Sequence, residues 1–132
     1  MKAPDHFVII DDDEFNNRIC SVTLSKLLPG AFISAFIDPV AGFEHIVTAY
    51  SNPAESHNCI LFLDINMPLL NGWDFLANFE KLSDEIKSRV SIYILSSSVD
   101  KKDIDRANQD KNVIRYLIKP LNKETIKSIT MQ

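Results

Sequence analysis

The feature that most constrains the fold of this chain is an unbroken apolar run that ends in one carboxylate. Residues 59–63 are Cys-Ile-Leu-Phe-Leu, Asp64 follows directly, and Pro68 closes the segment. An apolar run of this length, ended by turn residues, is typical of a strand buried on both faces of a parallel sheet. Open sheets of this kind bind ligands just beyond the carboxyl ends of their strands. We therefore expect Asp64 to lie in the functional site.

The rest of the chain alternates between segments typical of strands and of helices. Short apolar runs predict strands at residues 7–10, 31–37, 59–63, 90–95 and 113–118. Apolar spacing and capping residues predict helices at 15–28, after Asp38-Pro39, at 73–82, at 100–108 and after Asn122. This alternation predicts an α/β fold, a doubly wound five-stranded parallel sheet with five helices, as a single domain over residues 1–132.

Polar residues follow the strands at their carboxyl ends. Right-handed crossovers place all of these ends along one edge of the sheet. That edge then collects Asp11, Asp12, Asp13, Asp64, Ser96 and Lys119. Clustered carboxylates repel one another, by about 4 kcal/mol for two unit charges ~4 Å apart at intermediate dielectric. The site must take up a proton or a cation, and hard oxygen ligands in a compact site suit Mg²⁺.

Phosphoryl transfer to an aspartate needs these same groups. A carboxylate beside a bound Mg²⁺ is able to attack phosphorus, with Asp64 as the nucleophile. Lys119 would pair with the oxygens of the transferred phosphoryl group, and the Ser96 hydroxyl would donate a hydrogen bond to one of them. The residues at this edge therefore predict phosphoryl transfer to Asp64.

Four motifs, in this order and spacing, resemble the response-regulator receiver domain of two-component signalling, in the CheY-like superfamily. They are Ile9-Ile10-Asp11-Asp12, Leu63-Asp64-Ile65-Asn66-Met67-Pro68 with Gly72, Ile94-Leu95-Ser96-Ser97, and Tyr116-Leu117-Ile118-Lys119-Pro120. The resemblance covers the whole chain. It implies a flavodoxin-like sheet with strand order 2-1-3-4-5.

By this resemblance, Asp64 is the phosphoacceptor and Mg²⁺ is the cofactor. Asp12 would bind the metal directly, Asp11 largely through water, and Asn66 through its backbone carbonyl. The residues alone leave one alternative open. Three aspartates are consecutive, and strand alternation would place Asp11 and Asp13 on the same side.

The resemblance also implies a conformational switch. Ser96 matches the switch hydroxyl, Tyr116 matches its aromatic partner, and Lys119 matches the phosphate-binding lysine, whose bond to Pro120 is cis in the family. Phosphorylation of Asp64 would draw Ser96 and Lys119 inward and turn Tyr116. The surface of the fourth helix, fifth strand and fifth helix would then change its partners.

The implied function is that of a phosphorelay receiver, which is not an enzyme beyond assisting its own phosphorylation and dephosphorylation. A sensor histidine kinase or phosphotransfer protein would supply the phosphoryl group, and a downstream protein would read the switched surface. A homodimer through that surface is a further expectation. The formal net charge of −4 argues against nucleic-acid binding by this domain.

No apolar run in the sequence is long enough to span a membrane. Cys20 and Cys59 have neither a metal-binding spacing nor a disulfide pattern, which favours a cytoplasmic protein with reduced thiols. Two alternative functions remain. One is a receiver-like interaction domain that never takes phosphate. The other is an aspartate-nucleophile phosphatase, but such enzymes carry a second Asp where this chain has Asn66, which is unable to act as a general acid.

Overall fold

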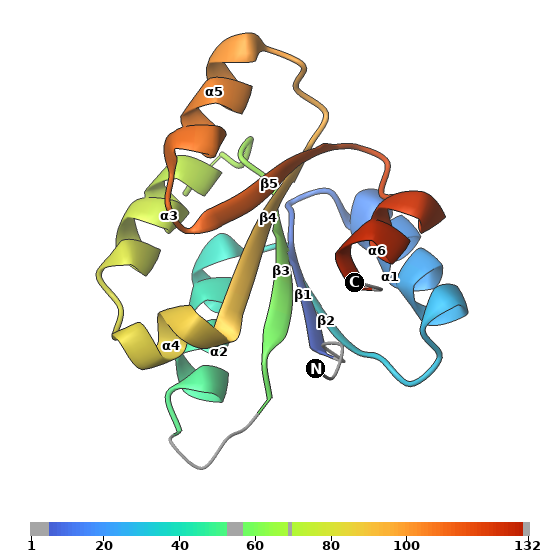
Figure 1. Ribbon diagram of the computed structural model, residues 1–132, viewed down its shortest axis with the longest axis horizontal. Coiled ribbons are helices and arrows are strands. Elements are labelled where there is room, and N and C mark those ends of the chain that lie inside the picture. The colour runs from blue at the N-terminus through green and yellow to red at the C-terminus, as the bar shows by residue number, and fades with distance from the viewer. Residues whose placement is uncertain (1–5, 53–56, 69, 131–132) are drawn as a thin grey trace.

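The structure is a computed structural model that describes residues 6–52, 57–68 and 70–130, and in this part of the chain five parallel strands form one sheet (Figure 1). The strand order is β2-β1-β3-β4-β5, as the resemblance implied. The strands are β1 (His6–Ile10), β2 (Phe32–Phe36), β3 (Cys59–Leu63), β4 (Val90–Ser96) and β5 (Val113–Ile118). All five strands predicted from the sequence are confirmed, two of them, β3 and β5, with the predicted bounds.

Helices cover both faces of the sheet, so the predicted doubly wound α/β fold is confirmed. On one face α1 and α6 lie side by side, and the other face carries α2, α3, α4 and α5 (Figure 1). The helices are α1 (Glu14–Leu27), α2 (Pro39–Tyr50), α3 (Gly72–Glu80), α4 (Asp84–Arg89), α5 (Lys101–Gln109) and α6 (Lys123–Thr130). The predicted caps are also present: Asp38 accepts the N–H of Val40, and Asn122 accepts the N–H of Thr125.

The described residues form six helices, so the prediction of five was wrong, and the additional one is α4. Ser83 caps this helix by accepting the N–H of Ile86 at 3.3 Å. Acidic residues occupy its first turn and basic residues its last, which suits the helix dipole. Ile86 is its one buried side chain, so no apolar periodicity marks the segment in the sequence. The predicted fourth and fifth helices are therefore α5 and α6.

The core is divided by the sheet into two clusters, and β3 contributes to both. Leu61 and Leu63 pack in the cluster under α2, α3, α4 and α5, whereas Ile60 and Phe62 pack in the cluster under α1 and α6. Every residue of β3 is buried, as expected for a central parallel strand. Both cysteines pack in the core, and burial raises the pKa of Cys20 to about 11 and that of Cys59 to about 12.

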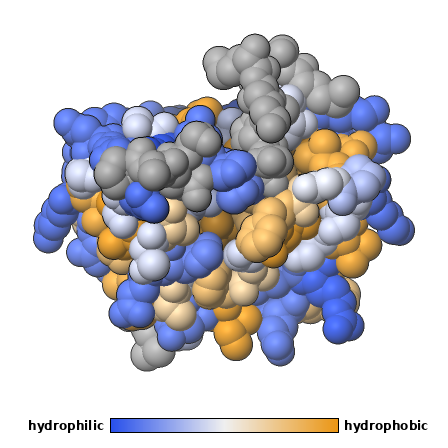
Figure 2. Space-filling model, turned by 90° about the horizontal axis from the view of Figure 1, so that it is seen from below, coloured by the Kyte–Doolittle hydropathy of each residue, from blue (hydrophilic) through white to orange (hydrophobic). Residues whose placement is uncertain are grey.

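Some large apolar side chains remain at the surface. They come from α1, β2 and the residue after it, α2, the segment before α5, and β5: Phe15, Val22, Phe32, Ile37, Val40, Val99, Ile114 and Ile118. Figure 2 views the edge at the amino-terminal ends of the strands, where hydrophobic and hydrophilic residues are interspersed. Among the described residues, no helix has both the length and the apolar character needed to cross a membrane.

The start of α3 packs against the chain segment that follows β3, and this contact can be tested at Gly72. A Cβ at this position would lie 2.6 Å from the Cα of Ile65 and 2.7 Å from the carbonyl oxygen of Asp64. Since both are backbone atoms, Gly72→Ala should lower the free energy of unfolding by about 1–3 kcal/mol, measured by urea denaturation. Gly30→Ala is the matched control, because a Cβ there meets nothing within 4 Å. Equal losses in both variants would contradict the close contact.

Candidate functional site

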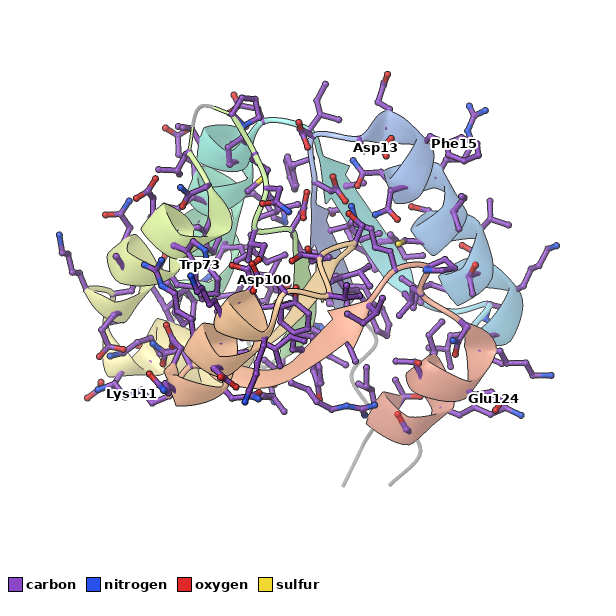
Figure 3. All side chains as sticks on the ribbon, turned by 90° about the horizontal axis from the view of Figure 1, so that it is seen from above. Asp13, Phe15, Trp73, Asp100, Lys111 and Glu124 are labelled. Atoms are coloured by element: carbon purple, nitrogen blue, oxygen red, sulfur yellow. The ribbon has the colours of Figure 1, made fainter. Side chains whose placement is uncertain are left out.

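The candidate site lies at the carboxyl ends of the strands, the edge viewed in Figure 3. Backbone pairing continues past the strand ends there. The N–H of Asp64 donates to the carbonyl of Ile10 at 3.0 Å, and the N–H of Lys119 donates to the carbonyl of Ser96 at 2.8 Å. These bonds hold the residue after β3 beside β1, and the residue after β5 beside β4. The sheet itself therefore sets the spacing of the site residues.

Three carboxylates meet at this edge. Asp11, Asp12 and Asp64 each offer one oxygen, and these oxygens lie within 4.8 Å of one another. Asp11 is 2% exposed and Asp64 5%, whereas Asp12 is exposed. Asp13 has a different role: it caps α1 by accepting the N–H groups of Phe15 and Asn16. The open alternative of an Asp13 ligand therefore has no support in this geometry.

Burial alters the titration of Asp64. Desolvation, aided by the negative charge of Asp11, raises the pKa of Asp64 from 3.8 to about 6. Lys119 and the N–H of Asn66, which donates to Asp64 Oδ1 at 3.3 Å, act in the opposite direction. Burial and the charge of Asp11 thus disfavour the ionised form of Asp64, and a further cation beside its carboxylate would stabilise that form.

Lys119 provides a cation between two of these acids. Its Nζ lies 2.6 Å from Asp11 Oδ2 and 3.8 Å from Asp64 Oδ2. Burial alone would lower the pKa of Lys119, but the hydrogen bond to Asp11 and the charges of both acids raise it overall. The side chain is therefore protonated and is shared between the two carboxylates. The peptide bond from Lys119 to Pro120 is cis, as the resemblance implied.

Ser96 and Tyr116 are connected through Ser98. The Ser96 hydroxyl is fully buried and accepts the N–H of Ser98 at 3.1 Å. The Tyr116 hydroxyl donates to the carbonyl of Ser98 at 2.8 Å. The Ser98 hydroxyl in turn donates to Asp103, in the first turn of α5, at 2.8 Å. The two predicted switch residues thus belong to one hydrogen-bonded chain that reaches α5.

Sequence reasoning missed two buried asparagines of α1 at this site. Asn16 Nδ2 donates to Asp11 Oδ2 at 2.8 Å, and Asn17 Nδ2 donates to the backbone carbonyl of Asp11 at 3.0 Å. The sequence holds a signal for Asn16. It lies four residues before Cys20 and eight before Leu24, on the same buried stripe of the helix. A polar residue on an apolar stripe needs a hydrogen-bond partner, and here the partner is Asp11.

The site fits a divalent cation by its donors and its charge. Its three carboxylates and the ammonium of Lys119 give a net charge of −3 + 1 = −2. Carboxylate oxygens are the ligands that Mg²⁺ uses in proteins, and Asp12 is accessible from solvent. The side chain of Asn66 is exposed next to this cluster, two residues after Asp64. The residues present therefore offer the oxygen ligands that Mg²⁺ requires.

The doubly wound sheet, with an acidic cluster and a lysine at its carboxyl edge, is the arrangement that a receiver-type domain requires. The family model for the response regulator receiver domain matches residues 7–130. The chain is 26% identical to a response regulator receiver protein from Dyadobacter fermentans, over 93% of this chain and 92% of that chain, with a TM-score of 0.83. The chain therefore belongs to the response regulator receiver domain family.

Further solved structures agree with this fold. A two component response regulator from Cytophaga hutchinsonii is 26% identical over 98% of this chain and 95% of that chain, with a TM-score of 0.85. The chemotaxis protein CheY4 of Vibrio cholerae is 18% identical over 96% of this chain and 95% of that chain, and its TM-score of 0.74 shows the shared fold alone. No curated protein matched the chain.

The raised pKa of Asp64 predicts a pH dependence of stability in metal-free protein. A folded-state pKa of about 6, above the ordinary 3.8, means that the folded protein binds this proton more tightly than the unfolded chain. Stability from this group is therefore full below pH ~3.8 and falls as the pH rises towards about 6. The Tm of Asp64→Asn, measured in EDTA, should exceed that of the wild type by a margin that grows over this window.

Glu80 provides an internal contrast for that measurement. Hydrogen bonds from Lys111 and Asn112 lower the pKa of Glu80 to about 2, so its contribution is present above its ordinary pKa of 4.5 and is lost as the pH falls. Glu80→Gln should therefore have a lower Tm than the wild type above pH ~4.5, and the difference should shrink as the pH falls below that value. A Tm difference for Asp64→Asn that does not change between pH ~4 and ~7 would contradict the raised pKa.

Proposed function

We propose that this receiver domain works in a two-component phosphorelay and accepts a phosphoryl group on Asp64 from a sensor histidine kinase or phosphotransfer protein. The observation that carries the proposal is the position of Asp64, buried at the sheet edge with Asp11, Asp12 and Lys119 around its carboxylate. Such a costly cluster of like charges has a use in phosphoryl transfer and none in a purely structural role.

The proposed metal site uses the side chains of Asp11, Asp12 and Asp64 and the backbone carbonyl of Asn66. Asp12 would bind the metal directly, because its side chain is exposed, and Asp11 would act largely through water, because its oxygens already accept hydrogen bonds within the protein. Mg²⁺ held by these residues would supply positive charge that offsets the carboxylates and the charge that develops on the phosphoryl oxygens.

In the proposed reaction, a carboxylate oxygen of Asp64 attacks the phosphorus of a phosphohistidine. The new O–P bond forms as the N–P bond breaks, and the released histidine nitrogen keeps the electron pair of that bond. Lys119, now shared between Asp11 and Asp64, pairs with a phosphoryl oxygen, and the Ser96 hydroxyl donates to another. The product is an acyl phosphate on Asp64.

The proposed switch follows from the connections of Ser98. If Ser96 turns towards the phosphoryl group, the N–H of Ser98 loses its acceptor. The carbonyl of Ser98 accepts the hydrogen bond of the Tyr116 hydroxyl, and the Ser98 hydroxyl donates to Asp103 on α5. A movement of Ser96 is therefore passed to both Tyr116 and α5, and the surface formed by α5, β5 and α6 changes its partners.

The proposed partners are proteins. The exposed side chains of Phe15, 71% exposed, and Val22, 46% exposed, lie on α1, whose first turn adjoins the site. Figure 3 shows Phe15 and Asp13 at the same end of this helix. An apolar surface beside the phosphoacceptor suits contact with the phosphodonor protein. The surface of α5, β5 and α6 would bind a downstream protein or a second copy of the domain, and no nucleic acid or membrane is involved.

We further propose that residues 1–132 form one receiver domain that works in the cytoplasm. The matched family model reaches from residue 7 to residue 130, which supports a single domain. The domain would assist its own phosphorylation and dephosphorylation, and we assign it no other enzymatic activity. The aspartate-nucleophile phosphatase remains disfavoured, because Asn66 stands where such an enzyme needs a second acid.

Phosphorylation can be tested with a small phosphodonor. Incubation with acetyl phosphate and Mg²⁺ should add one phosphoryl group, detected by intact mass, because Asp64 and its metal site need no kinase for this chemistry. Asp64→Asn and EDTA should each abolish the addition. Addition that persists in Asp64→Asn would place the phosphoacceptor elsewhere. No addition and no Mg²⁺ binding in the wild type would favour the phosphate-independent interaction domain.

The switch can be followed at Trp73 of α3, which lies beside α5 (Figure 3). The Arg106 guanidinium of α5 lies over the Trp73 ring, 4.4 Å from its centroid. Beryllofluoride with Mg²⁺ should change Trp73 emission if α5 moves, and Arg106→Ala should weaken that response. Arg115→Ala is the matched control, since Arg115 bonds to Ser128 of α6. An identical response in wild type and Arg106→Ala would show that emission does not report on α5.

A further inference from the structure

Asp11 is held by the protein at each of its side-chain oxygens. Its Oδ1 accepts the N–H of Asp13 at 2.9 Å. Its Oδ2 accepts both the amide of Asn16, at 2.8 Å, and the ammonium of Lys119, at 2.6 Å. Asp12, next in the chain, is exposed and has no such set of donors in the described structure. The two neighbouring acids are therefore prepared for different roles.

The side-chain amide of Asn16 donates to Asp11 Oδ2, and the Asn16 side chain also interacts with Cys20 one turn further along α1. Asn16 is 6% exposed and lies in the first turn of α1, on the buried stripe that it shares with Cys20 and Leu24. Burial of an unpaired amide costs free energy, so the bond to Asp11 fixes where the side chain points. The rigid helix thus supplies a donor whose position does not depend on the state of the site.

Lys119 is a less permanent partner of Asp11. Its Nζ is already 3.8 Å from Asp64 Oδ2, and in the proposed reaction it pairs with the phosphoryl group on Asp64. When that happens, Asp11 Oδ2 loses its ammonium partner. Asn16 is then the side-chain donor that remains on this oxygen. The orientation of the Asp11 carboxylate after phosphorylation depends on it.

We infer that Asn16 is a positioning residue for the metal site: it holds the Asp11 carboxylate in the orientation that supports the divalent cation, both before and after Lys119 moves to the phosphoryl group. The inference rests on the proposed function. Groups that hydrogen-bond to metal-binding carboxylates and histidines commonly change metal affinity about 10- to 100-fold when they are removed. Asn16 acts through Asp11 and does not itself touch the phosphoryl group.

Asn17 supplies a matched control from the same turn of α1. It is the same residue type, is also 6% exposed, and also donates to Asp11. Its donation goes to the backbone carbonyl, however, with a second, longer contact to the carbonyl of Phe36 at 3.5 Å. Removal of Asn17 should loosen the packing of α1 on the sheet while both carboxylate oxygens of Asp11 keep their donors.

The test compares Mg²⁺ affinity by calorimetry, and thermal stability, in wild type, Asn16→Ala, Asn16→Leu and Asn17→Ala. Both Asn16 variants should raise the Kd for Mg²⁺ about tenfold. Asn16→Leu has the same branched shape and is not smaller, so its effect reports the lost donor and not a cavity. Asn17→Ala should lower the Tm and leave the Kd within about twofold, since the carboxylate is untouched.

Acetyl phosphate kinetics provide the second readout. In the Asn16 variants the Mg²⁺ concentration for half-maximal phosphorylation should rise by the same factor as the Kd, while the rate at saturating Mg²⁺ stays near that of the wild type. A merely structural role would move the Tm and neither Mg²⁺ value. Unchanged Mg²⁺ affinity in folded Asn16→Leu or Asn16→Ala, or an equal loss in Asn17→Ala, would overturn the inference.

Failure of the proposed function has a different signature. If the wild-type protein binds no Mg²⁺ and takes no phosphoryl group from acetyl phosphate, both the function and the inference fall. If the wild type does both, through Asp64, and the Asn16 variants match it, only the inference falls. Circular dichroism at the titration temperature establishes that each variant is folded before its Kd is compared.

Discussion

The structure of the site depends on one charge balance, the ammonium of Lys119 between two nearly buried carboxylates. Burial of Asp11 and Asp64 side by side opposes folding, and Lys119 offsets part of that cost through its contacts at 2.6 and 3.8 Å. The exposed acid Asp12 completes a cluster in which negative charge remains in excess. The protein thus holds these groups rigidly with an excess of negative charge, which a divalent cation or the uptake of a proton would offset. This excess charge is what makes the edge suited to bind a cation and, through that cation, a phosphoryl group.

This charge balance depends on the sheet, which positions each charged group without the help of a ligand. The residues that carry it follow three different strands, and backbone hydrogen bonds beyond the strand ends hold Asp64 to β1 and Lys119 to β4. The central strand β3 is buried along its whole length, so its register is strongly determined. A one-residue slip would exchange the β3 side chains that pack in the two core clusters and would shift Asp64 relative to Asp11 and Lys119. The same apolar packing that stabilises the fold therefore fixes the geometry of the site.

The sequence predicted the strands, the sheet edge and the acidic cluster because these depend on strong local signals. The apolar character of residues 59–63 and 113–118 is enough to locate both ends of strands β3 and β5. Because all strands are parallel, their carboxyl ends then lie along one edge of the sheet. The helix α4 was missed because it has one buried anchor, Ile86, and is held by capping and charge. Asn16 was missed for a different reason. Its place on the buried stripe of α1 signals that it needs a hydrogen-bond partner, but the spacing along the chain does not show that the partner is Asp11.

The elements that would move are those held by polar contacts. α5 has one fully buried side chain, Ala107, and is joined to its neighbours by the Ser98–Asp103 hydrogen bond and the Arg106–Trp73 contact. Hydrogen bonds and cation–π contacts of this kind each contribute on the order of 1 kcal/mol, less than the roughly 1.5–3 kcal/mol from the burial of one large core side chain. A charge added at nearly buried Asp64 would interact with neighbouring charges by several kcal/mol, about 4 kcal/mol at ~4 Å and intermediate dielectric. That energy exceeds the contribution of each polar contact of α5. Phosphorylation would therefore be strong enough to rearrange α5 while the apolar clusters beneath the sheet stay unchanged.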